Sequence, residues 1–431
     1  MLFRKVTNNI DEWYKGKKTA LLIDGARQVG KTTIIEEYLN KNKIDYVEFN
    51  LIENQIARDA FNTSIDANDL LLKLSAISKK PLKKGKTVIF IDEAQEPNDA
   101  ITPIKFLVKE GSYRFIFSGS LLGVKMKDIQ SAPIGSMTVI NMYPMDFEEF
   151  LIANSTNKDT IDYLKECFYK LKPVDNDIHR QIMNIFNKYL VVGGLPKAVR
   201  EYVETNNMSK VRDAQYDVDK GYLMDVAKYK KEEKLLIDDI YELIPSELNA
   251  KNKRFIIKSL DKKARYYNYE SSLVWFKNSA IGLFTYTVDE PVYPLRASVK
   301  RQLFKLFLCD TGLLVHKLAK DTAAKILTNH LNINYGAIYE SVVAQELTAH
   351  EIPLYYYNNK KQGEVDFLIE DGDQIIPIEV KSGKDYDRHV ALDKLLETKN
   401  YSIDRAYVLC NENIKIKEKK IYLPIYFVMF I

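Results

Sequence analysis

Two patterns of apolar and polar residues alternate in the first third of the chain. Short apolar runs end in polar residues and predict strands, and the segments between them repeat apolar positions with helical spacing. The predicted strands are 19–24, 45–50, 87–92 and 113–118, and the predicted helices are 33–42, 66–79 and 99–110. Alternating strands and helices predict an α/β fold with a parallel sheet that has helices on both faces.

The pattern changes after this region. The segment YPMDFEEF, from Tyr143, begins a helical region that predicts an α-helical lid over 151–225. Between 226 and 315, helices precede a predicted hairpin of Gly282–Thr287 with Phe304–Leu308, an order typical of a winged helix. The basic stretch KNKRFIIKSLDKKAR at 251–265 is either a DNA-contacting helix or a solvated, lysine-rich connector.

A glycine-containing loop, GARQVGKTT, lies between the first predicted strand and helix and matches the pattern G-x-x-x-x-G-K-S/T. Gly25 and Gly30 allow main-chain N–H groups to face an anion. Lys31 would reach the β- and γ-phosphates. The alternative is a helix-starting loop with an incidental lysine. The pattern predicts ATP and Mg²⁺ binding by Gly25, Ala26, Arg27, Gln28, Val29, Gly30, Lys31, Thr32 and Thr33, with Thr32 as a metal ligand.

Polar residues also follow the third and fourth predicted strands. Asp92 and Glu93 end the apolar run VIFI, where Asp92 would hold Mg²⁺ through water and Glu93 would orient or deprotonate the attacking water. The alternative is that both residues cap the next helix. Ser118 and Ser120 are candidates to contact the γ-phosphate or the attacking water, unless they form an ordinary strand-to-helix turn.

The sequence VGGLPKA at 192–198 has two interpretations. Two glycines break one helix, and Pro196 is well placed to begin the next, so the segment could be a simple connection. It could also sense nucleotide, with Pro196 near the base and Lys197 near the phosphates.

A third group of charged residues lies in GEVDFLIEDGDQIIPIEVKSG at 363–383. Glu379 and Lys381 point to the same face of a strand, and a hairpin can bring Asp366 beside them. Glu340, on a predicted helix upstream, is available to the same site. Carboxylates at these positions could hold Mg²⁺ through Asp366 and Glu379 for phosphodiester cleavage, with Lys381 positioning the water. The alternatives are a charged surface hairpin, or an acidic cluster that pairs with Lys381 and only shapes the domain.

Composition narrows these interpretations only slightly. The chain has 431 residues and a formal net charge of +4, which permits nucleic-acid binding without arguing for it. Three scattered cysteines fit neither a disulfide framework nor a zinc site, so we expect a reducing, cytoplasmic location. No apolar stretch reaches the length of a spanning helix, so no membrane association is expected.

Taken in order, these motifs resemble a prokaryotic family. Its members have an AAA-type P-loop ATPase and a C-terminal domain of unknown function that contains a PD-(D/E)xK nuclease-like module. The matching segments are GARQVGKTT, VIFIDEAQ, FIFSGSLLG, YPMDFEEF, GGLPKAV, FKLFLCDTGLL, GAIYESVVAQEL, GEVDFLIE and IPIEVKSG. We therefore expect an ATPase core at 1–150, a lid at 151–225, a winged-helix-like segment at 226–315 and a nuclease-like domain at 316–431.

The resemblance implies ATP hydrolysis supported by Lys31 and Glu93, and a nuclease-like catalytic site at Glu340, Asp366, Glu379 and Lys381. Similar chains often carry an arginine where this one has Ser136. If that arginine neutralises transition-state charge, its absence here would slow ATP turnover. Hydrolysis could then require an arginine from a protein partner or a second copy. Two functions remain open. One is an ATP-driven enzyme that binds or cleaves DNA, and the other is a nucleotide-dependent switch whose nuclease-like domain only binds.

Overall fold

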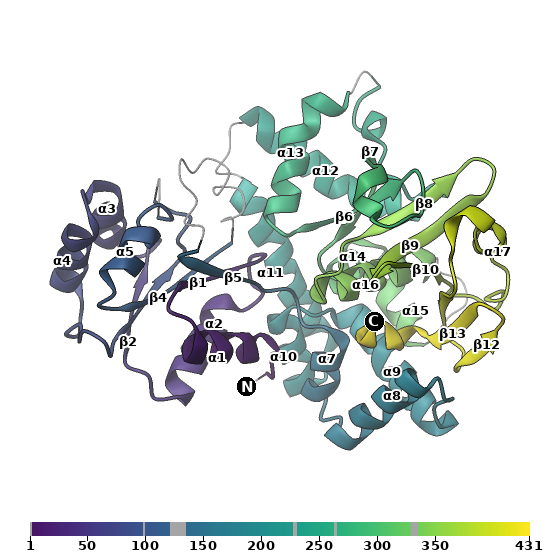
Figure 1. Cartoon of the computed structure of the whole chain (residues 1–431), viewed down its shortest axis with the longest axis horizontal. Helices are drawn as coiled ribbons and strands as arrows, with labels where there is room; N and C mark the ends of the chain where they lie inside the picture. The colour runs from purple at the N-terminus through teal and green to yellow at the C-terminus, as the bar shows by residue number, and fades with distance from the viewer. Residues whose placement is uncertain (1, 98–99, 121–134, 227–230, 263–264, 329–334) are drawn as a thin grey trace. The chain divides into compact units, whose positions relative to one another are not determined.

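The computed structural model describes the whole chain except residues 1, 98–99, 121–134, 227–230, 263–264 and 329–334. The chain divides into two compact units (Figure 1). The N-terminal unit contains Arg4–Tyr143 with Asn278–Ala280, and the C-terminal unit contains Pro144–Lys277 and Ile281–Ile431.

The N-terminal unit is built on a five-stranded sheet in which every strand pair is parallel. The strand order is β2-β3-β4-β1-β5. The strands are β1 (Ala20–Asp24), β2 (Tyr46–Asn50), β3 (Val88–Asp92), β4 (Arg114–Gly119) and β5 (Met137–Asn141). All five residues of β3 are buried, as expected for a central parallel strand that is covered on both faces.

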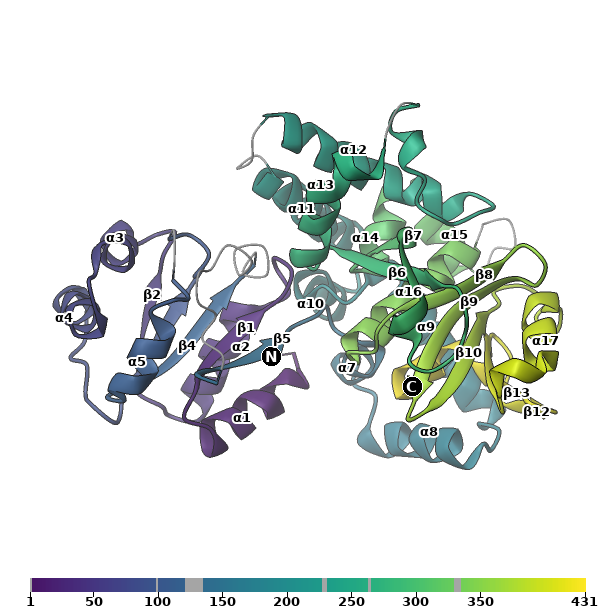
Figure 2. The same ribbon diagram turned by 45° about the horizontal axis from the view of Figure 1, so that its top comes forward.

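Helices cover both faces of this sheet (Figures 1 and 2). On one face, alternate residues of the strands, among them Leu22, Ile89 and Phe117, pack in one apolar cluster with Leu70 and Ile104 of the helices. The helices of this cluster are α3 (Gln55–Thr63), α4 (Ala67–Ile77) and α5 (Ile104–Glu110), and the helices on the other face are α1 (Val6–Gly16) and α2 (Lys31–Lys41). The predicted α/β fold with a parallel sheet is confirmed.

Helices form most of the first half of the C-terminal unit. They are α7 (Phe147–Ala153), α8 (Lys158–Lys170), α9 (Asn176–Val192), α10 (Pro196–Thr205), α11 (Met208–Val226), α12 (Lys231–Asn249) and α13 (Tyr266–Asn278). Their starts follow local chemistry, since Asp146 and Glu149 form a capping box for α7, and the side chains of Asn157 and Asp175 cap α8 and α9.

The second half of the C-terminal unit contains an eight-stranded mixed sheet in the order β12-β13-β11-β10-β9-β8-β6-β7. Its strands are β6 (Gly282–Val288), β7 (Val299–Leu308), β8 (Tyr355–Asn359), β9 (Gly363–Asp371), β10 (Gln374–Val380), β11 (Ala406–Cys410), β12 (Lys415–Lys417) and β13 (Lys420–Pro424). The helices among them are α14 (Thr311–Lys317), α15 (Thr322–Leu327), α16 (Tyr335–Ala349) and α17 (Val390–Glu397), with short 3-10 turns at Ile257–Ser259, Leu295–Ser298, Lys399–Tyr401 and Ile425–Phe430. Helix α16 lies against β6, β7 and β10.

The hairpin predicted in the winged-helix-like segment is present as β6 and β7, which pair antiparallel from Gly282 with Leu308. It does not stand apart from the C-terminal domain, however, because β6 also pairs in parallel with β8. The predicted domain boundary at 315 is therefore not a boundary in the structure, because strands from both sides of it belong to one sheet. The reason is that β6 has β7 on one edge and β8, a strand much later in the chain, on the other.

Two further features concern the chain as a whole. No helix in the described ranges is both long enough and apolar enough to cross a membrane. The apolar tail continues β13 as the buried 3-10 segment Ile425–Phe430, which packs in the C-terminal unit instead of extending the strand.

Candidate functional site

The predicted phosphate-binding loop connects β1 to α2 in the N-terminal unit, and α2 begins at Lys31. Gly30 caps this helix with a left-handed backbone, with φ of 94°. Gly25 has φ of +152°, and a Cβ atom there would overlap the carbonyl oxygen of Met142. Both positions therefore require glycine, and the loop lies at a helix N-terminus, where backbone N–H groups and the helix dipole favour an anion.

Lys31 is buried and its ammonium group has neutral acceptors. Its Nζ donates to the carbonyl oxygens of Gly25 at 2.9 Å and Ala26 at 2.8 Å. Burial lowers the pKa of Lys31 to about 8, although the nearby Glu93 and other carboxylates act in the opposite direction. A phosphate in the loop would replace carbonyl dipoles with a full negative charge beside this ammonium group.

Asp92 lies at the end of β3 and collects hydrogen bonds from three elements. Thr32 Oγ1 donates to its two carboxylate oxygens at 3.2 and 3.1 Å, Asn50 Nδ2 donates at 3.1 Å, and Ser118 Oγ also donates to it. The predicted residues Thr32, Asp92 and Ser118 thus meet at one edge of the sheet. A hydroxyl and a carboxylate at this distance are hard oxygen donors of the kind that Mg²⁺ prefers, so the residues fit a magnesium ion.

Sequence reasoning missed Asn50, although a signal was available. Asn50 ends β2 as Asp92 ends β3, and the two residues are register partners in the parallel pair. Polar residues that end adjacent parallel strands meet at the same edge of a sheet.

Glu93 follows Asp92 in a left-handed conformation, with φ of 55°. Gln95 Nε2 donates to Glu93 Oε2, while Gln95 Oε1 is buried and has no hydrogen-bond partner among the described residues. Gln95 is a further residue that the sequence interpretation missed, and it fixes the carboxylate that was predicted to orient water. The other predicted contact residue, Ser120, is buried just after β4.

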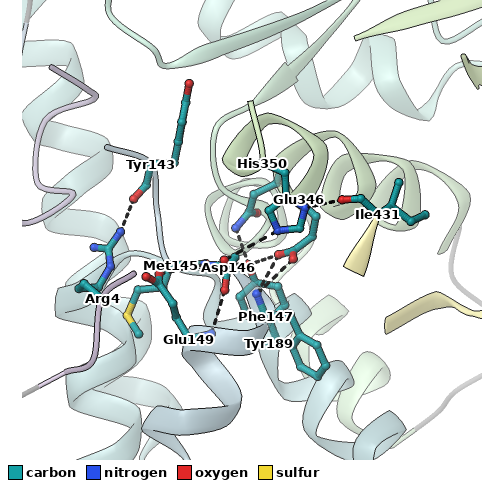
Figure 3. Close-up of polar contacts among 11 residues, drawn as sticks. Arg4, Tyr143, Met145, Asp146, Phe147, Glu149, Tyr189, Glu346, His350 and Ile431 are labelled. Atoms are coloured by element: carbon teal, nitrogen blue, oxygen red, sulfur yellow. Dashed lines mark hydrogen bonds and ion pairs between the residues drawn. The ribbon is translucent and has the colours of Figure 1, made fainter. Parts of the chain in front are cut away.

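Arg4 also holds the loop, from a position that no motif indicated. The side chain is 7% exposed. Its Nη1 donates to the carbonyl oxygen of Val29 in the loop at 2.9 Å, and its Nη2 donates to the carbonyl oxygen of Tyr143 at 2.6 Å (Figure 3). Arg4 therefore connects the phosphate-binding loop to the segment that leaves the N-terminal unit.

The VGGLPKA segment belongs to the C-terminal unit. Pro196 occupies the first turn of α10, as predicted for a helix start. Gly194 N donates to Asp310 Oδ2 at 2.6 Å, and Gly193 has φ of +75° against the same carboxylate. Lys197 forms an ion pair with Asp217. These contacts give the turn a structural role, and nucleotide sensing by Pro196 stays a prediction.

The C-terminal charged residues come together through strand register. Strands β9 and β10 pair antiparallel with Ile378 opposite Phe367, so continuing the register places Glu379 opposite Asp366. Val380 N donates to Asp366 Oδ2 at 2.9 Å, and Lys381 Nζ lies 2.7 Å from Glu379 Oε1. The predicted hairpin that gathers these side chains is therefore present.

Three charged residues that were not predicted join this cluster, namely Lys253, Lys305 and Glu364. Lys305 Nζ lies 3.0 Å from Glu340 Oε2 and 2.7 Å from Glu364 Oε1, and Lys253 pairs with Glu340 Oε1. Burial, followed by Glu340 and Glu379, raises the pKa of Asp366 well above its usual value. The pKa of Glu340 is lowered because Lys305 and Lys253 outweigh its burial.

Comparisons with known protein families match three parts of the chain. Residues 17–151 match the model of an AAA domain, residues 183–324 match a domain of unknown function (DUF8612), and residues 335–428 match a domain of unknown function (DUF4143). No curated protein matches the chain.

Similar solved structures include the Walker-type ATPase paby2304 of Pyrococcus abyssi, with 13% identity over 74% of this chain and 96% of that chain and a TM-score of 0.44. Cdc6p of Pyrobaculum aerophilum has 10% identity over 76% and 93% with a TM-score of 0.26, and the Holliday junction branch migration motor RuvB of Thermotoga maritima has 12% identity over 65% and 89% with a TM-score of 0.30. All three TM-scores are below 0.5, so these similarities carry no functional argument. By the family matches and its own loop geometry, the chain contains an AAA-type P-loop ATPase domain followed by a C-terminal domain of unknown function.

Proposed function

We propose that the N-terminal unit binds ATP together with Mg²⁺ and hydrolyses it. The observation that carries this proposal is the pairing of Thr32 with Asp92 next to the buried ammonium group of Lys31. A hydroxyl, a carboxylate and a lysine at a helix N-terminus are the groups needed to hold a metal ion and a triphosphate side by side.

Each residue then has a distinct task. Backbone N–H groups of Gly25–Thr33 bind the phosphates, and Lys31 neutralises the β- and γ-phosphate charge. Thr32 and Asp92 would hold Mg²⁺, which when bound offsets charge on the phosphate oxygens. Glu93 orients or deprotonates the attacking water, and Gln95 holds the Glu93 carboxylate in place.

The direct test is ATP turnover by the full chain, with and without DNA, for the wild type, Lys31→Ala and Glu93→Gln. We expect Lys31→Ala to lose ATP binding, because no other described side chain places an ammonium group on the loop carbonyls. Glu93→Gln should bind ATP and fail to turn it over. Equal turnover in all three proteins would refute the proposal.

Ser136 bears on the rate of this reaction. If an arginine at this position neutralises transition-state charge in similar chains, its absence here predicts slow turnover by the isolated protein. An arginine supplied by a second copy or another protein partner would then stimulate hydrolysis. The neighbouring stretch of 132–134 lies outside the described residues. Turnover per subunit that rises with protein concentration would support a second copy as the source.

A nucleotide-dependent switch is the second candidate, and the connecting segment Asn141–Phe147 favours it. On its N-terminal side, Met142 N donates to Asp24 O at 2.7 Å and Tyr143 O accepts from Arg4. On its C-terminal side, Met145 N donates to Gly194 O at 2.7 Å. A single residue, Pro144, separates the two sets of contacts.

The C-terminal end of this segment enters a buried polar network (Figure 3). Tyr189 Oη donates to the Met145 carbonyl oxygen and to Glu346 Oε1, both at 2.7 Å, and Phe147 N donates to Glu346 at 3.0 Å. In this candidate function, a change at the phosphate-binding loop that moves Met142 is passed along the chain to Met145 and Phe147. ATP binding then changes the C-terminal unit and exposes a surface for a protein or nucleic-acid partner.

Hydrogen exchange of the full chain separates the two candidates. A switch predicts that ATP changes protection at 144–150 and 189–195, that turnover is slow, and that Arg4→Met weakens the change without abolishing ATP binding. Fast ATP turnover with no change in protection beyond residue 143 would support ATP hydrolysis and contradict the switch. DNA binding by the C-terminal unit is a separate proposal, which DNA-stimulated turnover would support.

A further inference from the structure

The resemblance to PD-(D/E)xK nucleases implies a divalent cation held by Asp366 and Glu379, so the donor atoms around these carboxylates can be tested for their fit to a metal. Asp366 Oδ2 accepts from Val380 N, and Asp366 Oδ1 lies 3.7 Å from Lys305 Nζ. Glu379 Oε1 is paired with Lys381. Glu379 Oε2 alone is buried without a partner in the described part of the cluster. One uncommitted oxygen does not make a magnesium site, which needs several oxygen ligands.

Lys305 is the cation that faces Asp366 Oδ1. It lies on β7 opposite Thr285, and its side chain is 0% exposed. Its Nζ lies 3.0 Å from Glu340, 2.7 Å from Glu364 and 3.7 Å from Asp366. The ammonium group thus sits among three carboxylates that come from α16 and β9, and one of them, Asp366, is a ligand that the resemblance implies for the metal.

The charges in the cluster are close to balance without a metal. Four carboxylates, those of Glu340, Glu364, Asp366 and Glu379, face three ammonium groups, those of Lys253, Lys305 and Lys381. A divalent cation added to this set would leave excess positive charge in a buried site, which is costly.

Burial differs within the cluster. Glu340 is 1% exposed and Glu379 is 6% exposed, whereas the side chains of Asp366, Lys253 and Lys381 are 13%, 22% and 26% exposed. A cation bound between Glu340 and Asp366 would require Lys305 to leave its buried position. If Lys305 left, the buried Glu340 carboxylate would have only Lys253 to neutralise it, which is costly.

We propose that Lys305 and Lys381 are the resident cations of this cluster, that they face the carboxylates of Asp366 and Glu379 in place of a divalent ion, and that the C-terminal unit is consequently not a metal-dependent nuclease. The cluster then stabilises the fold, and the ammonium groups of its three lysines perform the charge neutralisation that a metal performs in a nuclease. The basic stretch at 251–265, a candidate for DNA contact, contributes at least Lys253 to this interior role. The inference does not depend on ATP hydrolysis by the other unit.

The test measures Mn²⁺ binding by the full chain without nucleotide. Electron paramagnetic resonance detects the bound ion, and thermal unfolding reports its effect on stability. All proteins carry Asp92→Asn, which removes the metal ligand of the phosphate-binding loop. Otherwise unaltered protein should bind no Mn²⁺ at the C-terminal cluster, and its melting temperature should not respond to the ion. Mn²⁺ binding that Glu379→Gln removes, or DNA cleavage in Mn²⁺ that Asp366→Asn removes, would overturn the proposal.

Lys305→Met gives the complementary result, since methionine nearly matches the length of the lysine side chain and leaves the carboxylates without their cation. We expect this variant to be destabilised, to bind Mn²⁺ at least about tenfold more tightly than the protein with Lys305, and to be stabilised by the ion. An unchanged Mn²⁺ response would overturn the proposal. If Lys305→Met does not fold, Lys305→Met with Glu340→Gln removes both charges of the pair. This double variant should fold without Mn²⁺, and a requirement for Mn²⁺ would count against the proposal.

Discussion

Replacing Asp310 with alanine should destabilise the C-terminal unit, because its buried carboxylate joins two elements at once. Asp310 Oδ1 accepts from Leu313 N at 2.9 Å and caps α14, while Oδ2 accepts from Gly194 N at 2.6 Å in the turn before α10. The absence of a side chain on Gly193 makes room for this carboxylate, since a Cβ atom there would overlap both of its oxygens.

The magnitude follows from these two bonds. Loss of a helix N-cap costs roughly 0.5–2 kcal/mol, and a buried N–H left without an acceptor, as at Gly194, costs about 1–3 kcal/mol. The expected loss in the free energy of unfolding for Asp310→Ala is therefore about 1.5–5 kcal/mol near neutral pH.

The effect should also depend on pH. Burial raises the pKa of Asp310 to about 6, against an unfolded value of 3.8, even though the backbone N–H groups of Gly194 and Leu313 favour the charged form. A raised folded-state pKa means that the folded protein binds the proton more tightly. The contribution of Asp310 to stability is thus full below pH 3.8 and decreases as the pH rises through about 6. The difference in the free energy of unfolding between wild type and Asp310→Ala should decrease over the same pH interval, by at most about 3 kcal/mol.

The assay is urea unfolding followed by tryptophan fluorescence. The chain contains two tryptophans, Trp13 in the N-terminal unit and Trp275 in the C-terminal unit, and both are buried. In a Trp13→Phe background the signal comes from Trp275 and reports the C-terminal unit. Asp321→Ala is the matched control, because Asp321 also precedes a helix but makes no capping bond, and it should change little. A shift for Asp310→Ala no larger than this control would refute the reasoning.

Three predictions concern the nucleotide site. Gly25→Ala should weaken ATP binding at least about tenfold by calorimetry, because its Cβ would overlap the Met142 carbonyl oxygen and distort the loop; unchanged affinity would contradict this. Asp92→Asn should raise the Mg²⁺ concentration needed for half-maximal turnover and leave metal-free ATP binding nearly intact, and an unaltered Mg²⁺ dependence would show that Asp92 has another task. Gln95→Leu should lower kcat about tenfold without changing the ATP dissociation constant, since it frees the Glu93 carboxylate, and a change confined to affinity would argue for a role in binding instead.

The sequence predicted the central strands of the N-terminal unit because a parallel sheet covered on both faces leaves a plain signal. Strand β3 reads VIFID and is buried throughout. Strand β5, MTVIN, escaped prediction because it lies at the edge of the sheet and is largely half-buried or exposed, so its residues do not form an apolar run. Helix α3 was also missed, since its short sequence buries only Ala57, Ala60 and Phe61.

The candidate nucleotide site was predictable to the extent that its residues are close in sequence or end neighbouring strands. Lys31, Thr32, Asp92 and Ser118 were identified in this way, and the structure places the last three within one set of hydrogen bonds. Arg4 could not be found, because a single arginine before the first helix has no pattern around it. Its importance comes from tertiary contacts with two carbonyl oxygens, which leave no trace in sequence spacing.

Lys305 is a different case, because its signal was present. A charge inside an apolar strand is costly unless it is paired, and Glu379 is such a charge in the segment IPIEV. The segment FKLFL of β7 satisfies the same condition, with Lys305 between buried residues. Two lone charges of opposite sign in two apolar strands of one sheet should be considered together, since each predicts a buried partner of the other sign. Considered in that way, Lys305 argues for an internally neutralised cluster, and the motif around Glu379 alone could not distinguish that cluster from a metal site.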